Sequence, residues 1–272
     1  MEDNRDVEAG ENPFQPYLDA LRKELELQDP IFIIGIIISL AVVVISFVLL
    51  KYFLSSKTVQ SAVLLVGLCD SGKTLLFSRL LSGKFKKTQT SITDSSATYK
   101  AKNEKGSSWT LIDLPGHDSL RPQYVEKFKS AARRVKIRVA IVFVVDSAIF
   151  QKEVRDVAEF LYFLLTDSAV SRNVPYLIVA CNKQDITMAK SAKLIQQQLE
   201  KEMNTLRVTR SAALGTQDGS AGSSVYLGKK GKDFEFSQLP MKVEFLECSA
   251  RGSKGENGQA DIGSLEKSLA NL

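Results

Sequence analysis

Apolar runs alternate with segments of helical hydrophobic spacing from about residue 61 to the C-terminus. Five apolar runs predict β-strands, at 63–66, 109–113, 139–145, 176–180 and 243–248. Apolar residues recurring every three or four positions predict helices over 73–82, about 119–134, about 151–166, 190–203 and 264–271. A continuously apolar strand such as 139–145 is typical of a parallel strand covered on both faces. The alternation therefore predicts an α/β fold with a doubly wound, mostly parallel sheet.

A different pattern precedes this domain. Residues 31–50 carry no charge, and only Gly35, Ser39 and Ser46 interrupt the hydrophobic run. At about 1.5 Å per residue, such a run matches the roughly 30 Å hydrocarbon core of a bilayer. A cleaved signal peptide would instead have a basic start, a shorter apolar stretch and a small-residue cleavage site. The run predicts a single transmembrane helix, which gives the order tail (1–30), membrane helix (31–50), stem (51–60) and globular domain (61–272).

Charge is distributed unevenly about this run. The first 30 residues hold three basic and nine acidic side chains, a net charge of −6, so the rest of a +5 chain carries +11. Positively charged flanks stay on the cytosolic side, which predicts a cytosolic domain and an N-terminus across the membrane. Two interpretations of the excess charge stay open: contact with anionic lipid, RNA or an acidic protein, or solubility alone. We find no aromatic and basic pattern that marks a dedicated nucleic-acid site.

The three cysteines agree with a cytosolic domain. Cys69, Cys181 and Cys248 are odd in number and widely spaced, and they lie at the ends of predicted strands. Neither a disulfide framework nor a zinc site has this pattern, so we expect free thiols in a reducing compartment.

The strand at 63–66 leads into the most informative segment of the chain. Gly67-Leu68-Cys69-Asp70-Ser71-Gly72-Lys73-Thr74 fits G-x-x-x-x-G-K-[ST], the phosphate-binding loop or P-loop. Its backbone N–H groups wrap a polyphosphate, and the following helix offers its positive N-terminal end. We expect Lys73 to reach the β- and γ-phosphates and the Thr74 hydroxyl to ligate Mg²⁺. Alone, this loop predicts a nucleoside triphosphate without choosing the base.

Asn182-Lys183-Gln184-Asp185, at the end of the 176–180 strand, makes that choice. The Asp185 carboxylate can accept two N–H bonds from guanine, whereas adenine offers no matching pair of donors. A buried acceptor left unpaired costs roughly 1–3 kcal/mol, which disfavours ATP. The last strand delivers Ser249-Ala250 to the same edge of the sheet, where ligands of such folds bind. The sequence therefore predicts a guanine-nucleotide site formed by the P-loop and by Asn182, Lys183, Asp185, Ser249 and Ala250.

A third motif predicts a conformational switch. The strand at 109–113 ends in Asp113-Leu114-Pro115-Gly116, a D-x-x-G segment. We expect Asp113 to hold Mg²⁺ through water, and the Gly116 N–H to bond the γ-phosphate only while that phosphate is present. In the upstream segment 88–93, Thr90 is our choice to complete the Mg²⁺ shell. The alternative for 88–93 is a solvated loop that happens to be rich in hydroxyl groups.

These motifs together resemble the small GTPases of the Ras superfamily, and within it the Arf/Sar branch. The non-glycine residues Cys69 and Asp70 in the P-loop and His117 after D-x-x-G carry this narrower resemblance. Longer stretches at 88–92, 113–121, 231–240 and 243–250 resemble the family of signal recognition particle receptor β subunits. The resemblance covers most of the chain, and it identifies 61–272 as a P-loop G domain.

The resemblance implies a single-pass subunit of the endoplasmic reticulum membrane with a lumenal N-terminus. Its GTP-loaded form would bind the receptor α subunit for co-translational targeting, close to the ribosome or the translocon. A vesicle-coat GTPase of Arf/Sar type is the alternative, but a permanent membrane helix argues against it because those proteins cycle on and off membranes.

Hydrolysis is less well defined by the sequence than GTP binding. His117 is the candidate catalytic residue, because Sar-type relatives carry histidine after D-x-x-G. Neither Arg121 nor the basic run at 133–138 can be assigned to the γ-phosphate from sequence. A missing arginine can cost about 10³–10⁵ in rate, so we expect slow unaided turnover.

One stretch, 204–240, exceeds the needs of a minimal G domain. Within 211–224, ten of fourteen residues are Ser, Gly or Ala, which predicts a flexible loop. The segment 229–240 is basic at first and then alternates apolar residues. For it, contact with a partner or a membrane surface and a functionless excursion both stay open.

Overall fold

The computed structural model describes residues 30–54, 61–101, 108–120, 139–214, 225–252 and 258–272, with the isolated positions Pro16, Gln123 and Glu126. The chain forms two compact units, Met1–Thr58 and Val59–Leu272. The predicted tail, apart from Pro16 and Pro30, and most of the predicted stem lie outside the described residues.

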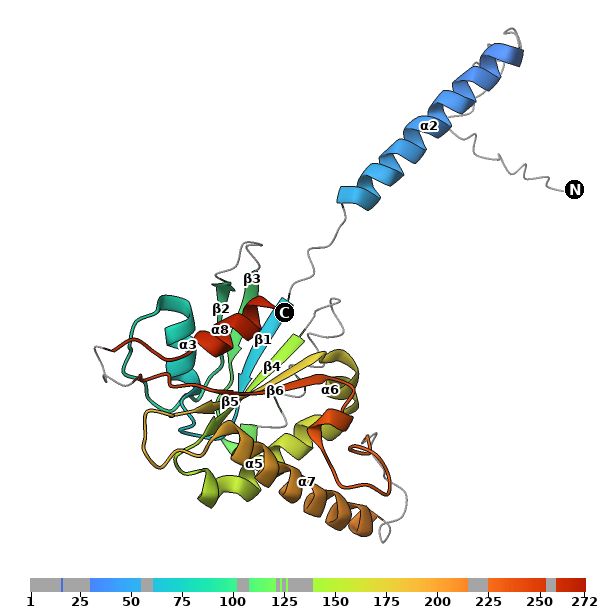
Figure 1. Ribbon diagram of the computed structural model, residues 1–272. Helices are drawn as coiled ribbons and strands as arrows, with labels where there is room; N and C mark the ends of the chain where they lie inside the picture. Colours follow the sequence, from blue (N-terminus) through green and yellow to red (C-terminus); the bar gives the residue numbers. More distant parts are fainter. Residues whose placement is uncertain are drawn as a thin grey trace, which may run out of the picture. The chain divides into compact units, whose positions relative to one another are not determined.

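Among its described residues, the first unit contains the apolar helix α2 (Pro30–Leu54), of 25 residues (Figure 1). Its described side chains are those of residues 34–49 and Lys51, and the large apolar ones are between 48% and 66% exposed. Searched over the described residues alone, the chain has no helix long and apolar enough to cross a membrane.

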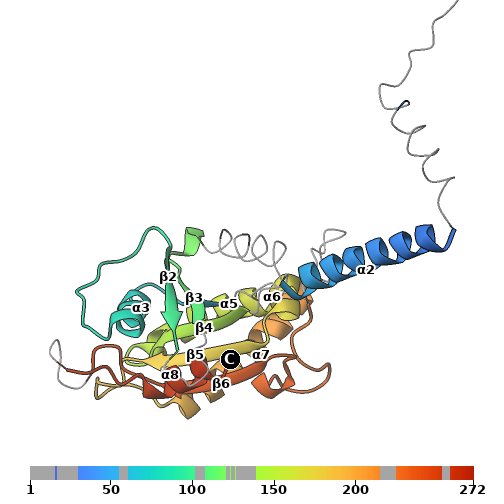
Figure 2. The same cartoon turned by 90° about the horizontal axis from the view of Figure 1, so that it is seen from above.

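The second unit is built on a six-stranded sheet of order β2-β3-β1-β4-β5-β6 (Figure 1, Figure 2). The strands are β1 (Ser61–Val66), β2 (Ser95–Lys100), β3 (Ser108–Asp113), β4 (Val139–Asp146), β5 (Tyr176–Asn182) and β6 (Lys242–Glu247). All neighbouring pairs are parallel except β2 and β3, which are antiparallel. The predicted α/β fold with a mostly parallel sheet is confirmed.

Helices cover both faces of this sheet. The first face carries α3 (Lys73–Ser82) and α8 (Gly263–Ala270), and the second carries α5 (Phe150–Thr166), α6 (Ser168–Asn173) and α7 (Ala192–Leu214) (Figure 1). Alternate residues of β4 enter the two cores: Phe143 packs with α5 and α7, and Val142 packs with α3 and α8. Because both faces of β4 are buried, the strand is apolar until its last residue.

Several elements differ from the sequence prediction. Helix α7 continues to Leu214 instead of ending at 203, because Leu206 and Arg207 still pack against the domain beyond that point. Strand β2 was not predicted, since it lies at the sheet edge and buries only Tyr99 among its six residues. Helix α6 was missed because it has only six residues. The helix predicted at about 119–134 lies mostly outside the described residues, which give a 3₁₀ turn at Asp118–Leu120.

Of the insertion 204–240, residues 204–214 belong to α7, and the described segment 225–239 folds back onto that helix. Leu227, Phe234 and Phe236 are each 2% exposed and belong to the core between the sheet, α5 and α7. The Phe236 ring meets those of Phe234 and Phe245 edge to face, at centroid distances of 5.2 and 5.0 Å. This segment is therefore part of the packed domain. The flexible loop predicted at 211–224 lies, from residue 215 onward, outside the described residues.

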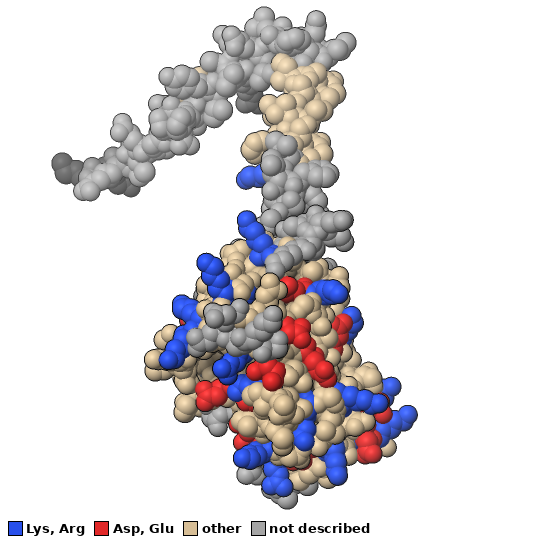
Figure 3. All heavy atoms as spheres, turned by 60° about the vertical axis from the view of Figure 1, so that its left-hand side comes forward, with Lys and Arg blue, Asp and Glu red and all other residues tan. Residues whose placement is uncertain are grey.

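Charged side chains are mixed on the face drawn in Figure 3. Lysine and arginine side chains are spread over it, and acidic groups lie between them. Nucleic-acid binding uses a patch or stripe of one sign. The part of the surface visible in this view carries both signs of charge and shows no such patch.

Candidate guanine-nucleotide site

The P-loop joins β1 to α3 at the carboxyl edge of the sheet, and two of its glycines are required by geometry. Gly67 has φ +147°, and a Cβ there would lie 2.3 Å from the Val144 carbonyl oxygen. Gly72 has φ +91°, and a Cβ there would lie 2.4 Å from Asn182 Nδ2. Any larger residue would meet both backbone strain and a clash, so the loop can approach its neighbours only through glycine.

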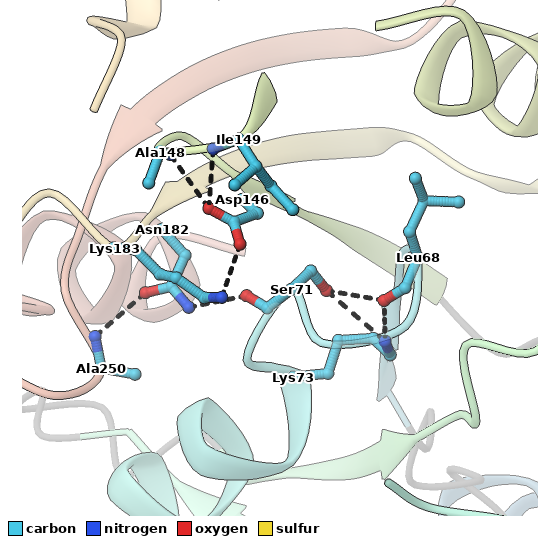
Figure 4. Close-up of polar contacts among 9 residues, drawn as sticks. All are labelled: Leu68, Ser71, Lys73, Asp146, Ala148, Ile149, Asn182, Lys183 and Ala250. Atoms are coloured by element: carbon cyan, nitrogen blue, oxygen red, sulfur yellow. Dashed lines mark hydrogen bonds and ion pairs between the residues drawn. The ribbon is translucent and has the colours of Figure 1, made fainter. Parts of the chain in front are cut away.

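Lys73 begins α3 and is only 6% exposed. Its Nζ donates to the Leu68 carbonyl oxygen at 2.5 Å and lies 3.4 Å from Ser71 Oγ (Figure 4). Burial lowers the Lys73 pKa, and the nearby Asp113 carboxylate partly opposes that shift. A buried ammonium group held by neutral oxygens gains from an anionic ligand, which is the property expected of a phosphate-binding lysine.

A cavity of about 210 Å³ opens beside this lysine. Three segments line it: the P-loop with the start of α3, the loop before β2, and the D-x-x-G segment after β3. The lining residues are Cys69, Asp70, Gly72, Lys73, Thr74, Leu75, Thr88, Gln89, Thr90, Ser91, Pro115 and Gly116. The fold thus brings the predicted switch residues Thr90 and Gly116 to the same cavity as the P-loop.

Thr74 and Asp113 form the part of this cavity that fits a magnesium ion. The Thr74 hydroxyl donates to Asp113 Oδ2 at 2.7 Å. Asp113 is 1% exposed, and among the described residues its Oδ1 has no hydrogen-bond partner. Burial raises the Asp113 pKa, while the bond from Thr74 and the charge of Lys73 act against the rise. Hydroxyl and carboxylate oxygens are the ligands Mg²⁺ prefers, so these residues suit the ion beside a phosphate.

Of the hydroxyl groups in the loop before β2, that of Ser91 reaches Thr74. Ser91 Oγ lies 2.9 Å from Thr74 Oγ1. Thr90 also lines the cavity, but the contact with Thr74 is made by Ser91. Thr90 as the Mg²⁺ ligand stays a prediction, and Ser91 is the neighbour that sequence reasoning passed over.

Asn182, 2% exposed at the end of β5, connects the P-loop to the segment after β6. Its Nδ2 donates to the Ser71 carbonyl oxygen at 2.8 Å, and its Oδ1 accepts from the Ala250 N–H at 3.0 Å (Figure 4). These residues are 111 and 68 positions away from it in the chain. One side chain therefore fixes the phosphate side and the base side of the site relative to each other.

Asp185 and Ser249 meet on the base side. Ser249 Oγ donates to Asp185 Oδ1 at 2.6 Å and accepts from the Gly252 N–H at 2.8 Å. The predicted base-reading residues Asn182, Asp185, Ser249 and Ala250 thus form one connected group.

Asp146, which sequence reasoning missed, positions the remaining member of that group. The carboxylate is 3% exposed at the end of β4, and its Oδ2 pairs with Lys183 Nζ at 2.5 Å. Its Oδ1 accepts from the N–H groups of Ala148 at 2.9 Å and Ile149 at 3.3 Å (Figure 4). Lys183 itself has a left-handed backbone, φ +66°. The available signal was an acidic residue that ends an otherwise apolar strand.

The D-x-x-G segment lies directly on the P-loop. A Cβ on Gly116 would be 2.6 Å from the Cys69 nitrogen and 2.7 Å from the Leu68 carbonyl carbon. His117 is exposed, its Nδ1 lies 2.9 Å from Ser119 Oγ, and it is not among the residues that line the cavity. The structure therefore places Gly116 at the phosphate cavity and His117 outside it, and a catalytic role for His117 stays a prediction.

The chain is similar to known proteins over most of its length. The family model described as "Signal recognition particle receptor beta subunit" matches residues 58–243. The "Signal recognition particle receptor subunit beta" of Mus musculus is 63% identical over 259 residues, which covers 95% of this chain and 94% of the mouse protein.

Solved structures give the same likeness. "The Structure of the Mammalian SRP Receptor" has a TM-score of 0.65 at 65% identity and covers 77% of this chain and 98% of its own. The "Signal recognition particle receptor SRb-GTP/SRX complex from Chaetomium thermophilum" has a TM-score of 0.56 at 23% identity. It covers 70% of this chain and 94% of its own, and it shows a shared fold.

Proposed function

The chain belongs to the signal recognition particle receptor beta subunit family, and on that premise we propose that it is a GTP-binding anchor subunit. Loaded with GTP, it tethers the receptor α subunit to the endoplasmic reticulum membrane for co-translational targeting. The observation that carries the proposal is Asn182, which holds the P-loop carbonyl of Ser71 and the backbone of Ala250 in one site. This arrangement joins the phosphate half and the guanine half of a single nucleotide pocket.

Dependence on the nucleotide state follows from the walls of the phosphate cavity. Thr90 and Gly116 come from two segments outside the P-loop, and both line the cavity beside Lys73. A terminal phosphate in that cavity would contact segments that a diphosphate leaves free, which is how an ordered switch is made. Thr74 and Asp113 would hold Mg²⁺, and the bound ion would neutralise charge on the phosphates.

Two observations support a protein partner. Ile92, in the loop beside the cavity, is 82% exposed, and a partner that covers it would remove a large apolar side chain from water. A related structure is named as a mammalian SRP receptor, and a more distant one as a GTP-bound complex with SRX. We carry that assembly over to this chain as the α subunit of its own receptor.

The membrane anchor is proposed from residues 31–50. They are uncharged in the sequence, they lie within helix α2, and the described apolar side chains between Ile34 and Leu49 are exposed. Lys51 follows in the last turn of α2, whereas the preceding tail has a net charge of −6. This asymmetry favours a cytosolic G domain and a lumenal tail.

Slow hydrolysis is proposed because no arginine lines the cavity in the described part of the chain and His117 lies outside it. We expect His117→Ala to leave GTP-dependent partner binding intact and to lower stimulated hydrolysis by about 100-fold or more. Single-turnover assays with and without the α subunit measure this. Ser119→Ala, which removes the neighbour of the His117 ring, is the matched control. Unchanged stimulated hydrolysis in His117→Ala would show that the histidine faces solvent or a partner.

The proposal is tested by capturing the α subunit on the full-length chain in detergent, with GTP or GDP loaded. We expect capture with GTP, little with GDP, and loss of capture in Thr74→Asn, because that substitution removes the hydroxyl that bonds Asp113. Thr209→Asn, at an exposed position of α7, is the control. Equal affinity in both nucleotide states would refute the switch, since a ligand that binds two states equally shifts neither.

A further inference from the structure

Arg79 is a buried cation of α3 whose hydrogen bonds go to backbone carbonyls of distant segments. It is 3% exposed. Its Nε donates to the Ala250 carbonyl oxygen at 3.0 Å, and its Nη2 donates to those of Arg251 at 3.2 Å and Gly258 at 2.9 Å. Its Nη1 donates to the Gly83 carbonyl oxygen at 3.0 Å, at the end of its own helix.

This geometry suits arginine and no other side chain. A guanidinium group presents donors in a rigid planar fork, so one residue reaches four carbonyl oxygens in different directions. A lysine has a single nitrogen and cannot reach all of them. Charge-assisted hydrogen bonds of this kind are among the strongest in proteins. Their electrostatic energy is larger still in the buried, low-dielectric interior.

The contacted segment belongs to the base side of the nucleotide site. Ala250 gives its N–H to Asn182 Oδ1 and its carbonyl to Arg79, so both faces of this stretch of backbone are held. The adjacent Ser249 hydroxyl bonds Asp185. The helix that carries Arg79 begins with Lys73, the phosphate-binding residue of the P-loop.

We infer that Arg79 is a positioning residue for guanine recognition, which fixes the backbone at Ala250, Arg251 and Gly258 against the P-loop helix. The inference rests on the proposed GTP binding. Because the base is common to GTP and GDP, loss of this contact weakens both nucleotides alike. It also narrows the preference for guanine over adenine, since Ser249 and Ala250 are no longer held beside Asp185 and Asn182.

The test measures release of fluorescent GDP, GTP and ADP from the full-length chain in detergent and from Arg79→Ala and Arg79→Lys. We expect guanine-nucleotide release at least about tenfold faster in Arg79→Ala, with an intermediate effect in Arg79→Lys, which keeps the charge but loses the fork. The preference for GDP over ADP should fall in the same order. Arg155→Ala, which removes an exposed arginine of α5, should release GDP at the wild-type rate.

A second substitution reaches the same segment from its other side. Gly252 has φ +80°, and a Cβ there would lie 2.1 Å from the Gln259 carbonyl oxygen, so Gly252→Ala distorts the segment without touching Arg79. If both residues act through one backbone segment, the double variant should release GDP more slowly than the product of the single effects predicts. Independent, multiplicative effects would overturn the inference.

The outcomes separate this inference from the proposed function. Should the wild-type chain fail to hold guanine nucleotide in the same assay, the proposed function itself is wrong. If the wild-type chain binds GDP and both Arg79→Ala and Arg79→Lys release it at the wild-type rate, the positioning role alone is overturned. Failure of both arginine variants to fold would also overturn it, because Arg79 would then act in stability and not in recognition.

Discussion

At the residue scale, the buried polar side chains of the G domain hold backbone segments that are remote in sequence. Asn182, Arg79 and Arg207 are each between 2% and 6% exposed, and each bonds backbone groups 25 or more positions away along the chain. A buried polar group without a partner is costly, so these residues stay buried only where the fold brings such partners to them. Substituting one of them therefore loosens a particular pair of segments.

Base choice is a prediction at this scale. Asp185→Asn should lower GTP affinity by roughly 10- to 100-fold and improve xanthine nucleotide binding, because an amide donor suits a carbonyl where guanine has an amino group. Competition among GTP, XTP and ATP measures it, with Asp156→Asn on the exposed side of α5 as control. Unchanged preference for GTP would remove Asp185 from base reading.

The cysteines allow a second prediction. Cys181 and Cys248 are at most 1% exposed, and burial raises the pKa of both thiols, that of Cys248 to about 12. The stability contributed by the protonated Cys248 thiol is complete below its ordinary pKa of 9.0 and is lost as pH rises toward 12. At about pH 8, iodoacetamide should label the partly exposed Cys69, more slowly with GTP bound, and spare the other two.

Peptide mapping by mass spectrometry checks this result, and Cys69→Ser should abolish native labelling. Rapid labelling of Cys248 in the folded chain would contradict the burial on which the prediction rests.

At the element scale, the extended α7 and the segment 225–239 support each other. Arg207, on the part of α7 beyond 203, donates to the carbonyl oxygens of Lys229 at 3.2 Å and Lys232 at 2.5 Å, and to Asn204 Oδ1 at 2.6 Å. Leu227 and Phe236 of the same segment pack into the core between the sheet, α5 and α7. The insertion is thus attached through a buried guanidinium group and an apolar anchor.

Arg207→Ala should release this segment and leave the nucleotide site intact. We expect a loss of about 2–3 kcal/mol in the free energy of unfolding, because bonds from a charged donor are removed in a buried place. Limited proteolysis should cut within 225–239 faster than in the wild-type chain, at unchanged GDP affinity. Arg210→Ala, whose side chain is 58% exposed, should change neither. If Arg207→Ala resists proteolysis as well as the wild-type chain does, the apolar contacts alone hold the segment 225–239 in place.

At the scale of the whole molecule, the G domain follows the uncharged apolar residues 31–50, and the proposed anchor places the two ends of that segment on opposite sides of a membrane. Protease added to sealed microsomes should remove the G domain and spare a short N-terminal fragment, because the domain follows the basic side of 31–50. Detergent should expose that fragment as well. Protection of the G domain would reverse the orientation, and extraction by alkaline carbonate would refute the span.

Much of the G domain was predictable because its signals are local. The P-loop glycines, the continuous apolar strands and the motifs at strand ends each act within a few residues. They predicted the sheet class correctly, and they named the candidate site residues, whose roles stay predictions. The prediction failed at α7 and β2, where the pattern alone was weak. Helix α7 goes on to Leu214 because a buried Arg207 and Leu206 contact the insertion and the core, and β2 is an edge strand with a single buried residue.

The sequence by itself determined the fold class, the P-loop and the guanine motif, since glycine conformations and hydrophobic periodicity are properties of short segments. Only the tertiary structure decided that Ser91 contacts Thr74, that Asp146 holds Lys183 and that Arg79 binds the carbonyls of Ala250 and Gly258. The physical reason is separation along the chain: Asp146 and Lys183 are 37 positions apart, and Arg79 and Ala250 are 171 positions apart. Contacts of that range depend on how the strands are ordered in the sheet, which no local pattern records.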